Sequence, residues 1–280
     1  MTTRIDFLSF SIALPDREYT NDLGVRPYLF EALEELVGEY WFERLTTEAM
    51  WHGGKPHRPF SSVIRRDDNT MSLFWNYRMS HALMEITGAG CAMLGAGGNE
   101  RGLLSMVQNN ASRLDIATDF LTDVNPREFA DQRTALRHRS GAEMFTPSGH
   151  TVYVGARTSN RFARVYRYAS PHPRSRFLRV EHELKHKDAK LVCREIVESG
   201  LIDVQLKLGA SFGWSHPLWN PEKVSVDKLP AWTPDLENAD SYRWLTSVVV
   251  PAMRRLHDKG KIDLPDFLKE HFPEWFLNRL

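Results

Sequence analysis

The sequence has only two cysteines, Cys91 and Cys193, in unrelated contexts and without the spacing of metal ligands. This scarcity argues against a disulfide framework and a zinc module, and it favours a reducing compartment, the cytoplasm. The sequence also lacks any run of about 18 uninterrupted apolar residues, and its amino terminus has no apolar signal-peptide core. We therefore expect a soluble, cytoplasmic protein with no membrane partner.

Net charge is absent as well, because 36 basic and 36 acidic residues balance. No protein-wide field indicates a nucleic-acid or membrane partner, so any polyanion site must be local. One stretch meets this condition: between Arg133 and Lys190 there are thirteen Lys and Arg but only four Asp and Glu. With 280 residues, 42% of them hydrophobic, the chain can still form a substantial core.

The first part of the chain alternates short β-rich segments with turn residues. The opening "RIDFLSFSI" predicts a strand with Ile5 and Phe7 on one face and Asp6 and Leu8 on the other. Then follow a helix over 28–50, a break over 52–60, an antiparallel meander, a Gly-rich loop "GAGCAMLGAGG" and a helix over 100–111. The loop lacks the Gly-Lys-Ser/Thr of a P-loop, so no nucleotide site is expected there.

The second part repeats this order loosely. Its elements are a strand "SRLDIATDF", a polar helix around 126–139, a hairpin "TVYVG…FARVYRY", a strand "FLRVEHELK" and a helix "AKLVCREIVESG". We expect an α+β fold over 1–200, with antiparallel β-sheets, covering helices and two lobes, 1–111 and 112–200. Residues 201–280, rich in Pro and Trp and with a helix-like stretch at 241–260, are expected to pack on this domain as a carboxy-terminal extension.

Two of the predicted strands place pairs of carboxylates on one face. A period of two puts Asp115 with Asp119 in "RLDIATDF", and Glu181 with Glu183 in "FLRVEHELK". Mg²⁺ and Mn²⁺ favour such oxygen ligands, but cross-strand ion pairs on a solvated face explain the pattern equally. For Asp119, orienting a basic residue ranks slightly above binding metal. His182 falls on the apolar face, so an interior histidine is expected there.

The hairpin combines tyrosine with arginine. Phe162, Arg164, Tyr166 and Tyr168 share one side of its second strand. A guanidinium binds phosphate bidentately and stabilises a phenolate, whose free pKa is near 10. Tyrosines packed at a rim beside solvated arginines are the ordinary alternative. The polar groups in and around the turn are Arg157, Asn160, Arg161 and Arg167.

The order of "DFLSF", "ALMEITGAGC", "RLDIATDF", "VYVGARTSNRFARVYRY" and "LRVEHELK" resembles the replication initiation factor (Rep-trans) family of rolling-circle plasmid and filamentous-phage initiators. The resemblance covers residues 4 to about 200. It implies a fold related to the HUH endonucleases, without their His-hydrophobic-His pair. It also implies a metal-dependent nicking and closing enzyme that cuts one origin strand through a 5′-phosphotyrosine and later rejoins it.

Residue by residue, the resemblance implies Tyr166 in "RVY" as the nucleophile and a Mg²⁺ or Mn²⁺ site. Family members commonly continue this strand with Asp-Lys, whereas this chain has Arg167 and Tyr168, so Tyr168 is a competing nucleophile. Arg164 and Lys185 are the further catalytic candidates, and the charge of the absent lysine is expected from Arg167 or Lys185. The metal-ligand candidates are Asp115, Glu181 and Glu183, and the DNA-binding candidates are Arg157, Asn160, Arg161, Arg167 and Tyr168.

The implied partner is origin DNA, double-stranded and locally single-stranded. A host helicase and a second copy of the chain are further candidate partners. Two other functions fit the same residues. One is an origin-binding or regulatory protein on this fold that does not cut DNA, and the other is a metal-dependent nuclease in which water replaces tyrosine as the attacking group.

Overall fold

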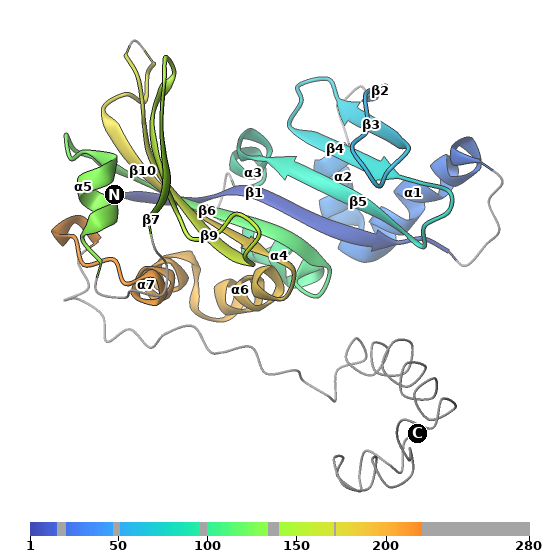
Figure 1. The fold of residues 1–280 in the computed structure, drawn as a ribbon. Helices are drawn as coiled ribbons and strands as arrows, with labels where there is room; N and C mark the ends of the chain where they lie inside the picture. Colours follow the sequence, from blue (N-terminus) through green and yellow to red (C-terminus); the bar gives the residue numbers. More distant parts are fainter. Residues whose placement is uncertain (16–20, 47–50, 96–99, 134–139, 171, 220–280) are drawn as a thin grey trace, which may run out of the picture. The chain divides into compact units, whose positions relative to one another are not determined.

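The computed structural model describes residues 1–15, 21–46, 51–95, 100–133, 140–170 and 172–219, all within one compact unit (Figure 1). Lobe 1 comprises β1 (Thr2–Ala13), α1 (Asp22–Val37), α2 (Glu39–Thr46), β2 (Trp51–Gly53), β3 (Ser62–Arg66), β4 (Met71–Trp75), β5 (His81–Thr87), α3 (Gly88–Gly95) and α4 (Glu100–Val107). Lobe 2 comprises β6 (Ala111–Leu121), α5 (Pro126–Asp131), β7 (Ser140–Thr146), β8 (Gly149–Val154), β9 (Arg161–Tyr168), β10 (Phe177–Lys185), α6 (His186–Ser199), α7 (Leu201–Phe212) and the 3₁₀ turn η1 (Pro217–Trp219).

The strands of both lobes form one antiparallel sheet in the order β2-β3-β4-β5-β1-β6-β10-β9-β8-β7. Each lobe has the same plan: a first strand, one or two helices, and a meander whose last strand returns to pair with the first. The two first strands, β1 and β6, pair with each other at the centre, so the strand order of lobe 2 mirrors that of lobe 1. The predicted α+β class with antiparallel strands and covering helices is confirmed, with one sheet running through both lobes.

One face of the sheet is apolar and packs against helices. Along β1 this face presents Leu8, Phe10 and Ile12, which join a buried cluster with residues of α1, α4 and α6. In lobe 2 the corresponding face packs against Phe212, Trp214 and Trp219 in a smaller cluster, and Figure 1 shows α6 and α7 along one side of these strands. The opposite face, here called the open face, carries polar residues of β1, β6, β9 and β10, and in lobe 1 also a small apolar cluster around Val63 and Phe74.

The predicted alternation of β1 is wrong at its start. Phe7 and Leu8 occupy the expected faces, but Ile5 pairs with Ile116 and faces the helices, and the pairing shifts between Ile5 and Phe7. The shift is a β-bulge at Asp6, the residue left over between the two pairings. A bulge re-aims side chains, and here it turns Asp6 to the open face, where it contacts Arg179.

Two further predictions in lobe 1 are corrected. The single helix expected over 28–50 is divided into α1 and α2 by Gly38, which has φ 75° and ends α1. The Gly-rich segment expected as a loop forms helix α3. A Cβ on Gly90 would lie 2.7 Å from the Thr70 carbonyl oxygen, and one on Gly88 would lie 2.9 Å from Asp6 Oδ1. These glycines therefore permit close packing of a helix rather than turns.

Residues 201–219, assigned from sequence to the extension, contain α7 and pack against lobe 2. His182 is fully buried and accepts a hydrogen bond from Trp214 Nε1 at 2.9 Å, in agreement with the predicted interior position.

Of the polar helix predicted around 126–139, the structure describes α5, and 134–139 lie outside the described residues. The rest of the extension, 220–280, with its predicted helix at 241–260, also lies outside them. In the described part of the chain no helix combines the length and apolar character needed to cross a membrane.

Gly209 in α7 is expected to be essential for docking the end of the described chain. A Cβ on Gly209 would lie 1.7 Å from Nε1 of the buried Trp219. Gly209→Ala should therefore lower the free energy of unfolding by about 1–3 kcal/mol, because overpacking outweighs the gain in helix propensity. The matched control is Gly24→Ala in α1, where the nearest atom is 3.8 Å away. Urea unfolding of both variants tests the expectation, and equal effects at the two sites would contradict it.

Candidate active site

Three neighbouring strands of lobe 2 place the polar candidates in one row on the open face. β10 lies between β6 and β9, and residues paired directly across antiparallel strands share a face. The pairs are Glu183 with Asp115, Glu181 with Arg164, and Arg179 with Tyr166. The alternation predicted for all three strands is therefore confirmed. Asp6 joins the same face from β1 through its bulge.

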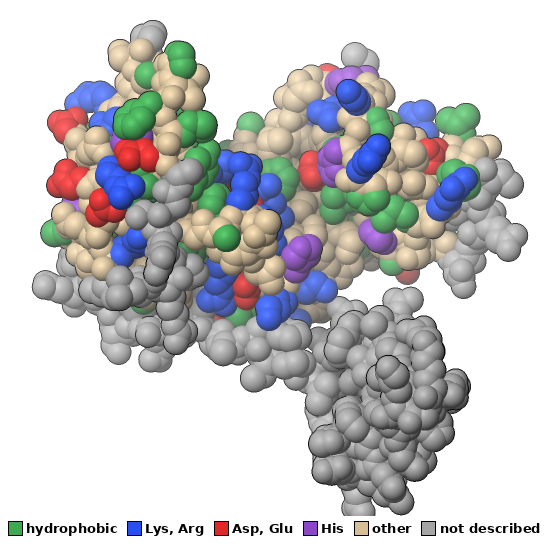
Figure 2. All heavy atoms as spheres, in the orientation of Figure 1, with side chains coloured by type: hydrophobic (Ala, Val, Ile, Leu, Met, Phe, Trp, Pro, Cys, Tyr) green, Lys and Arg blue, Asp and Glu red, His purple; other side chains and the backbone are tan. Residues whose placement is uncertain are grey.

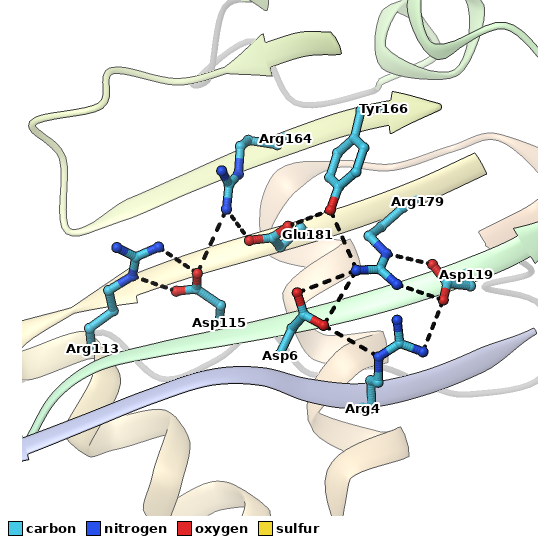
Figure 3. A network of polar contacts seen from close by, with 9 residues as sticks. All are labelled: Arg4, Asp6, Arg113, Asp115, Asp119, Arg164, Tyr166, Arg179 and Glu181. Atoms are coloured by element: carbon cyan, nitrogen blue, oxygen red, sulfur yellow. Dashed lines mark hydrogen bonds and ion pairs between the residues drawn. The ribbon is translucent and has the colours of Figure 1, made fainter. Parts of the chain in front are cut away.

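Tyr166 is held through its hydroxyl group. Figure 3 shows this oxygen between the side chains of Glu181 and Arg179. The hydroxyl donates to Glu181 Oε2 at 3.0 Å, and Arg179 Nη1 lies 3.5 Å from the same oxygen. Arg164 forms a close ion pair with the other oxygen of Glu181. The phenol thus has an acceptor for its proton and two guanidinium groups nearby.

Arg179 is buried and fixed by two carboxylates. It donates to Asp119 from Nε at 2.7 Å and from Nη2 at 3.0 Å, and its Nη1 contacts Asp6 at 3.3 Å. Arg4 connects the same two carboxylates, at 3.1 Å to Asp119 and 3.3 Å to Asp6. Asp119 therefore orients a basic residue, the role ranked first from sequence. This network aims one guanidinium at the hydroxyl of Tyr166 (Figure 3).

Asp115 and Glu183 form the other end of the row. Arg113 pairs bidentately with Asp115, at 2.8 and 2.6 Å, and also contacts Glu183 at 2.9 Å. Lys185 contacts Glu183 at 2.7 Å, and Arg164 lies 3.8 Å from Asp115. Both carboxylates are almost fully buried, with exposed fractions of 1% and 2%. Buried carboxylates need such partners, because an isolated charge there would cost several kcal/mol.

Burial shifts the titration of these groups. It is the main cause of a raised pKa for Tyr166, and the negative charge of Glu181 adds to it. Burial also raises the pKa of Asp115 to about 7, although the hydrogen bond and charge of Arg113 oppose the shift. At Glu183 burial is outweighed by Lys185 and Arg113, which lower the pKa. The phenol of Tyr166 is therefore protonated at neutral pH and needs an acceptor in order to attack.

The raised pKa of Asp115 predicts a pH-dependent stability. Between the usual Asp pKa near 4 and the folded value of about 7, the folded state binds the proton and the unfolded state does not. The contribution is therefore fully present below about pH 4 and is lost as the pH rises to 7. Asp115→Asn, which cannot ionise, should become more stable relative to the wild type over this window, by at most about 1.4 kcal/mol per pH unit. Urea unfolding without added metal at pH 5 and pH 8 measures this difference, and a constant difference would contradict it.

The carboxylates Asp115, Glu181 and Glu183 have the chemistry of a hard-cation site. They offer only oxygen donors, from two adjacent strands and one face. In the described residues, however, no three Asp, Glu, His or Cys side chains converge in the manner of metal ligands. Each of these three carboxylates instead pairs with Arg113, Arg164 or Lys185. The donor atoms are of the kind that a divalent ion takes, but among the described residues they are held in ion pairs and are not gathered as metal ligands.

The DNA-binding candidates lie at different places. Arg157 is exposed in the β8–β9 turn, and Arg161 pairs with Asp188 at the start of α6. Arg167 points away from the open face, since its guanidinium donates to the backbone carbonyls of Thr122, Val124 and Ser175. The backbone carbonyl of Asn160 accepts a hydrogen bond from the backbone amide of Lys185. Figure 2 shows Lys and Arg side chains at the surface near the middle of the view and also on both lobes.

The structure does not bring Lys185 to Tyr166. The residue opposite Tyr166 on β10 is Arg179, and Lys185 lies six positions further along the strand, roughly 20 Å away. Lys185 donates instead to Glu183 and to the carbonyl of Arg157. The cation beside the phenol is therefore Arg179, and Tyr168 lies next to Tyr166 on the same face with ring centroids 5.4 Å apart.

Sequence reasoning missed four members of the network: Arg4, Asp6, Arg113 and Arg179. Arg113 and Arg179 alternate in phase with the carboxylates of their own strands, which was the available signal for them. Asp6 had no such signal, because only the bulge brings it to the open face.

The comparisons with known proteins concern the fold. No family model matches the sequence, and no curated protein matches it. Among solved structures, the fold is similar to that of the rolling-circle replication initiator protein from Geobacillus stearothermophilus, with a TM-score of 0.53. The alignment covers 81% of this chain and 93% of that chain, at 15% identity. This chain thus shares its fold with a rolling-circle replication initiator.

Proposed function

We propose that this protein initiates rolling-circle replication by nicking and rejoining one strand of origin DNA through a phosphotyrosine at Tyr166. The main support is the hydroxyl of Tyr166, which lies between a proton acceptor, Glu181, and a cation, Arg179. The fold shared with a rolling-circle initiator is the second support. Tyr166 is preferred to Tyr168 because the hydroxyl of Tyr166 makes both of these contacts.

In the nicking step, the oxygen of Tyr166 attacks the scissile phosphorus and its proton passes to Glu181 Oε2. The bond from phosphorus to the 3′ oxygen breaks, and that oxygen takes a proton from water to become a 3′ hydroxyl. Arg179 stabilises negative charge on the phenolic oxygen, and Arg164 lies where it can offset charge on the phosphate. The 5′ phosphate remains esterified to Tyr166.

Rejoining reverses these transfers. A 3′ hydroxyl attacks the phosphotyrosine and gives its proton to water, and the leaving phenolate of Tyr166 recovers the proton held by Glu181. The phosphotyrosine conserves the energy of the ester, so this step needs no ATP. Arg179 again stabilises the phenolate, which the buried surroundings of Tyr166 disfavour.

A divalent cation is part of the proposal. Asp115, Glu183 and the Oε1 atom of Glu181 are the groups that would hold Mg²⁺ or Mn²⁺. When bound, the ion would supply Lewis-acid polarisation of the scissile phosphate. Arg113 and Arg164 would then be released from the carboxylates and become free to bind phosphate oxygens.

The ion pairs on all three carboxylates favour a second candidate, an origin-binding protein that does not cut DNA. Incubating supercoiled origin plasmid with the full chain and Mn²⁺ separates the possibilities. Nicking with a covalent protein–DNA adduct supports the proposal. Binding without cleavage indicates the second candidate, and cleavage that leaves a free 5′ phosphate indicates attack by water.

Glu181→Gln should reduce formation of the adduct by about 100-fold, because the amide neither accepts the phenolic proton nor holds a cation well. Affinity for the same DNA should change little, since the arginines remain. Gel quantification of the adduct and a binding assay measure the two effects. Glu143→Gln, outside the network, is the control. Normal nicking by Glu181→Gln would reject both roles given to this carboxylate.

A further inference from the structure

A cavity of about 250 Å³ opens beside Tyr166 on the open face of β8 and β9. Its floor consists of three directly paired positions: Gly149 with Tyr168, Thr151 with Tyr166, and Tyr153 with Arg164. The cavity therefore extends from the proposed nucleophile to a second tyrosine and an arginine. None of the preceding steps uses the part that lies beside Tyr168.

Gly149 keeps this part of the cavity open. Its φ is +148°, and a Cβ there would lie 2.2 Å from the carbonyl oxygen of Arg167. No side chain fits at this position, so the floor of the cavity opposite Tyr168 carries only the backbone of Gly149.

The aromatic rings of the cavity are already positioned by other rings. His172 stacks on Tyr168, with centroids 4.0 Å apart and planes at 17°, and Tyr166 contacts Tyr168 edge to face. Phe162 lies nearly parallel to Tyr153 at 5.8 Å. Ordering these rings would therefore cost little entropy when a flat ligand binds.

The size and lining of the cavity indicate a small, flat, polar ligand. Its volume is below the roughly 300–1,000 Å³ of sites for drug-sized ligands. The polar residues Thr146, Ser148 and Thr151 line it beside the tyrosines, and Arg164 lies at the end near Glu181. Proteins that bind single-stranded nucleic acid combine the same elements, aromatic platforms for bases and cations for the backbone.

We infer that this cavity binds the base of a nucleotide next to the scissile phosphate, with Tyr168 as its stacking platform. The inference rests on the proposed function, because that function places the scissile phosphate at Tyr166. It assigns a role to the position where the family that the sequence resembles commonly has lysine. Tyr168 is then a base-binding residue, and Tyr166 remains the nucleophile.

The test compares two probes of equal length, single-stranded oligo-dT and the corresponding abasic strand. Wild-type protein should bind oligo-dT more tightly. Tyr168→Leu should weaken binding of oligo-dT by about 5- to 150-fold, the effect of losing one stacked base, and should leave binding of the abasic strand nearly unchanged. Tyr168→Phe should retain the preference for oligo-dT, because the ring is kept. Tyr40→Leu, at an exposed tyrosine of α2, is the matched control.

Thr151→Leu provides a second variant in case Tyr168→Leu fails to fold, which thermal unfolding would show. It adds apolar volume in the cavity without removing a ring, and it should reduce the preference for oligo-dT in the same way. An unchanged preference in folded Tyr168→Leu or Thr151→Leu protein would overturn the inference while leaving an adduct at Tyr166 intact. A lost preference together with no adduct in wild-type protein would reject the proposed function and retain the base site.

Discussion

Tyr166→Phe should abolish the covalent protein–DNA adduct, with a loss of at least about 10³-fold, while the protein still binds origin DNA. The substitution removes one oxygen, and in the proposed reaction that oxygen is the attacking atom. The ring and its edge-to-face contact with Tyr168 remain, so the cavity beside it should persist. Denaturing gels that retain covalent adducts measure the loss directly.

Tyr168→Phe is the matched control, because it removes the neighbouring hydroxyl from the same strand and face. It should form the adduct at close to the wild-type rate. If Tyr168→Phe is inactive and Tyr166→Phe is active, the nucleophile is Tyr168. If both single variants form adducts and the double variant does not, either hydroxyl can attack, and the contacts with Glu181 and Arg179 do not select Tyr166.

Arg179→Gln should lower the free energy of unfolding by about 3–5 kcal/mol. Arg179 is 3% exposed and binds Asp119 with two nitrogens and Asp6 with a third. Removing Arg179 leaves these two carboxylates with Arg4 as their only remaining partner in this network. Burial already raises the pKa of both Asp6 and Asp119, which shows that their charged forms are costly there. Urea or guanidinium unfolding measures the loss.

The double variant Arg179→Gln, Asp119→Asn should recover part of this stability, because it removes one of the two carboxylates that the first change leaves to share Arg4. Arg127→Gln is the surface control. It breaks the exposed pair with Asp131 on α5 and should cost less than about 1 kcal/mol. An Arg179→Gln variant as stable as Arg127→Gln would show that the buried network contributes little to the fold.

Much of the candidate site follows from local alternation in the sequence. The strands "RLDIATDF", "FARVYRY" and "FLRVEHELK" each place their polar residues in phase, and a period of two does not depend on the rest of the fold. The same phase puts His182 in the interior. Alternation cannot state which residues lie opposite one another, however, because register depends on the neighbouring strand. That is why Arg179, opposite Tyr166, was not selected and Lys185 was.

Other features depend on contacts between distant parts of the chain. The bulge that turns Asp6 to the open face is visible only in the pairing of β1 with β6. The glycines of α3 allow close packing against Thr70 and Asp6. Composition alone makes this Gly-rich segment look like a loop. Whether Asp115 and Glu183 bind a metal ion or an arginine depends on the ion pairs that the fold brings to them. In this structure Arg113 forms ion pairs with both carboxylates.

The central pairing of β1 with β6 has a consequence for the order in which the protein is made. β1 leaves the ribosome first, yet one of its edges has no partner until β6 follows more than a hundred residues later. Asp6 and Arg179, which are in contact in the folded protein, lie 173 residues apart in the sequence. At about 5–20 residues per second, translation takes roughly 10–35 s to pass from Asp6 to Arg179. Tyr166, the proposed nucleophile, and its contacts with Glu181 and Arg179 are thus assembled near the end of synthesis of the described chain.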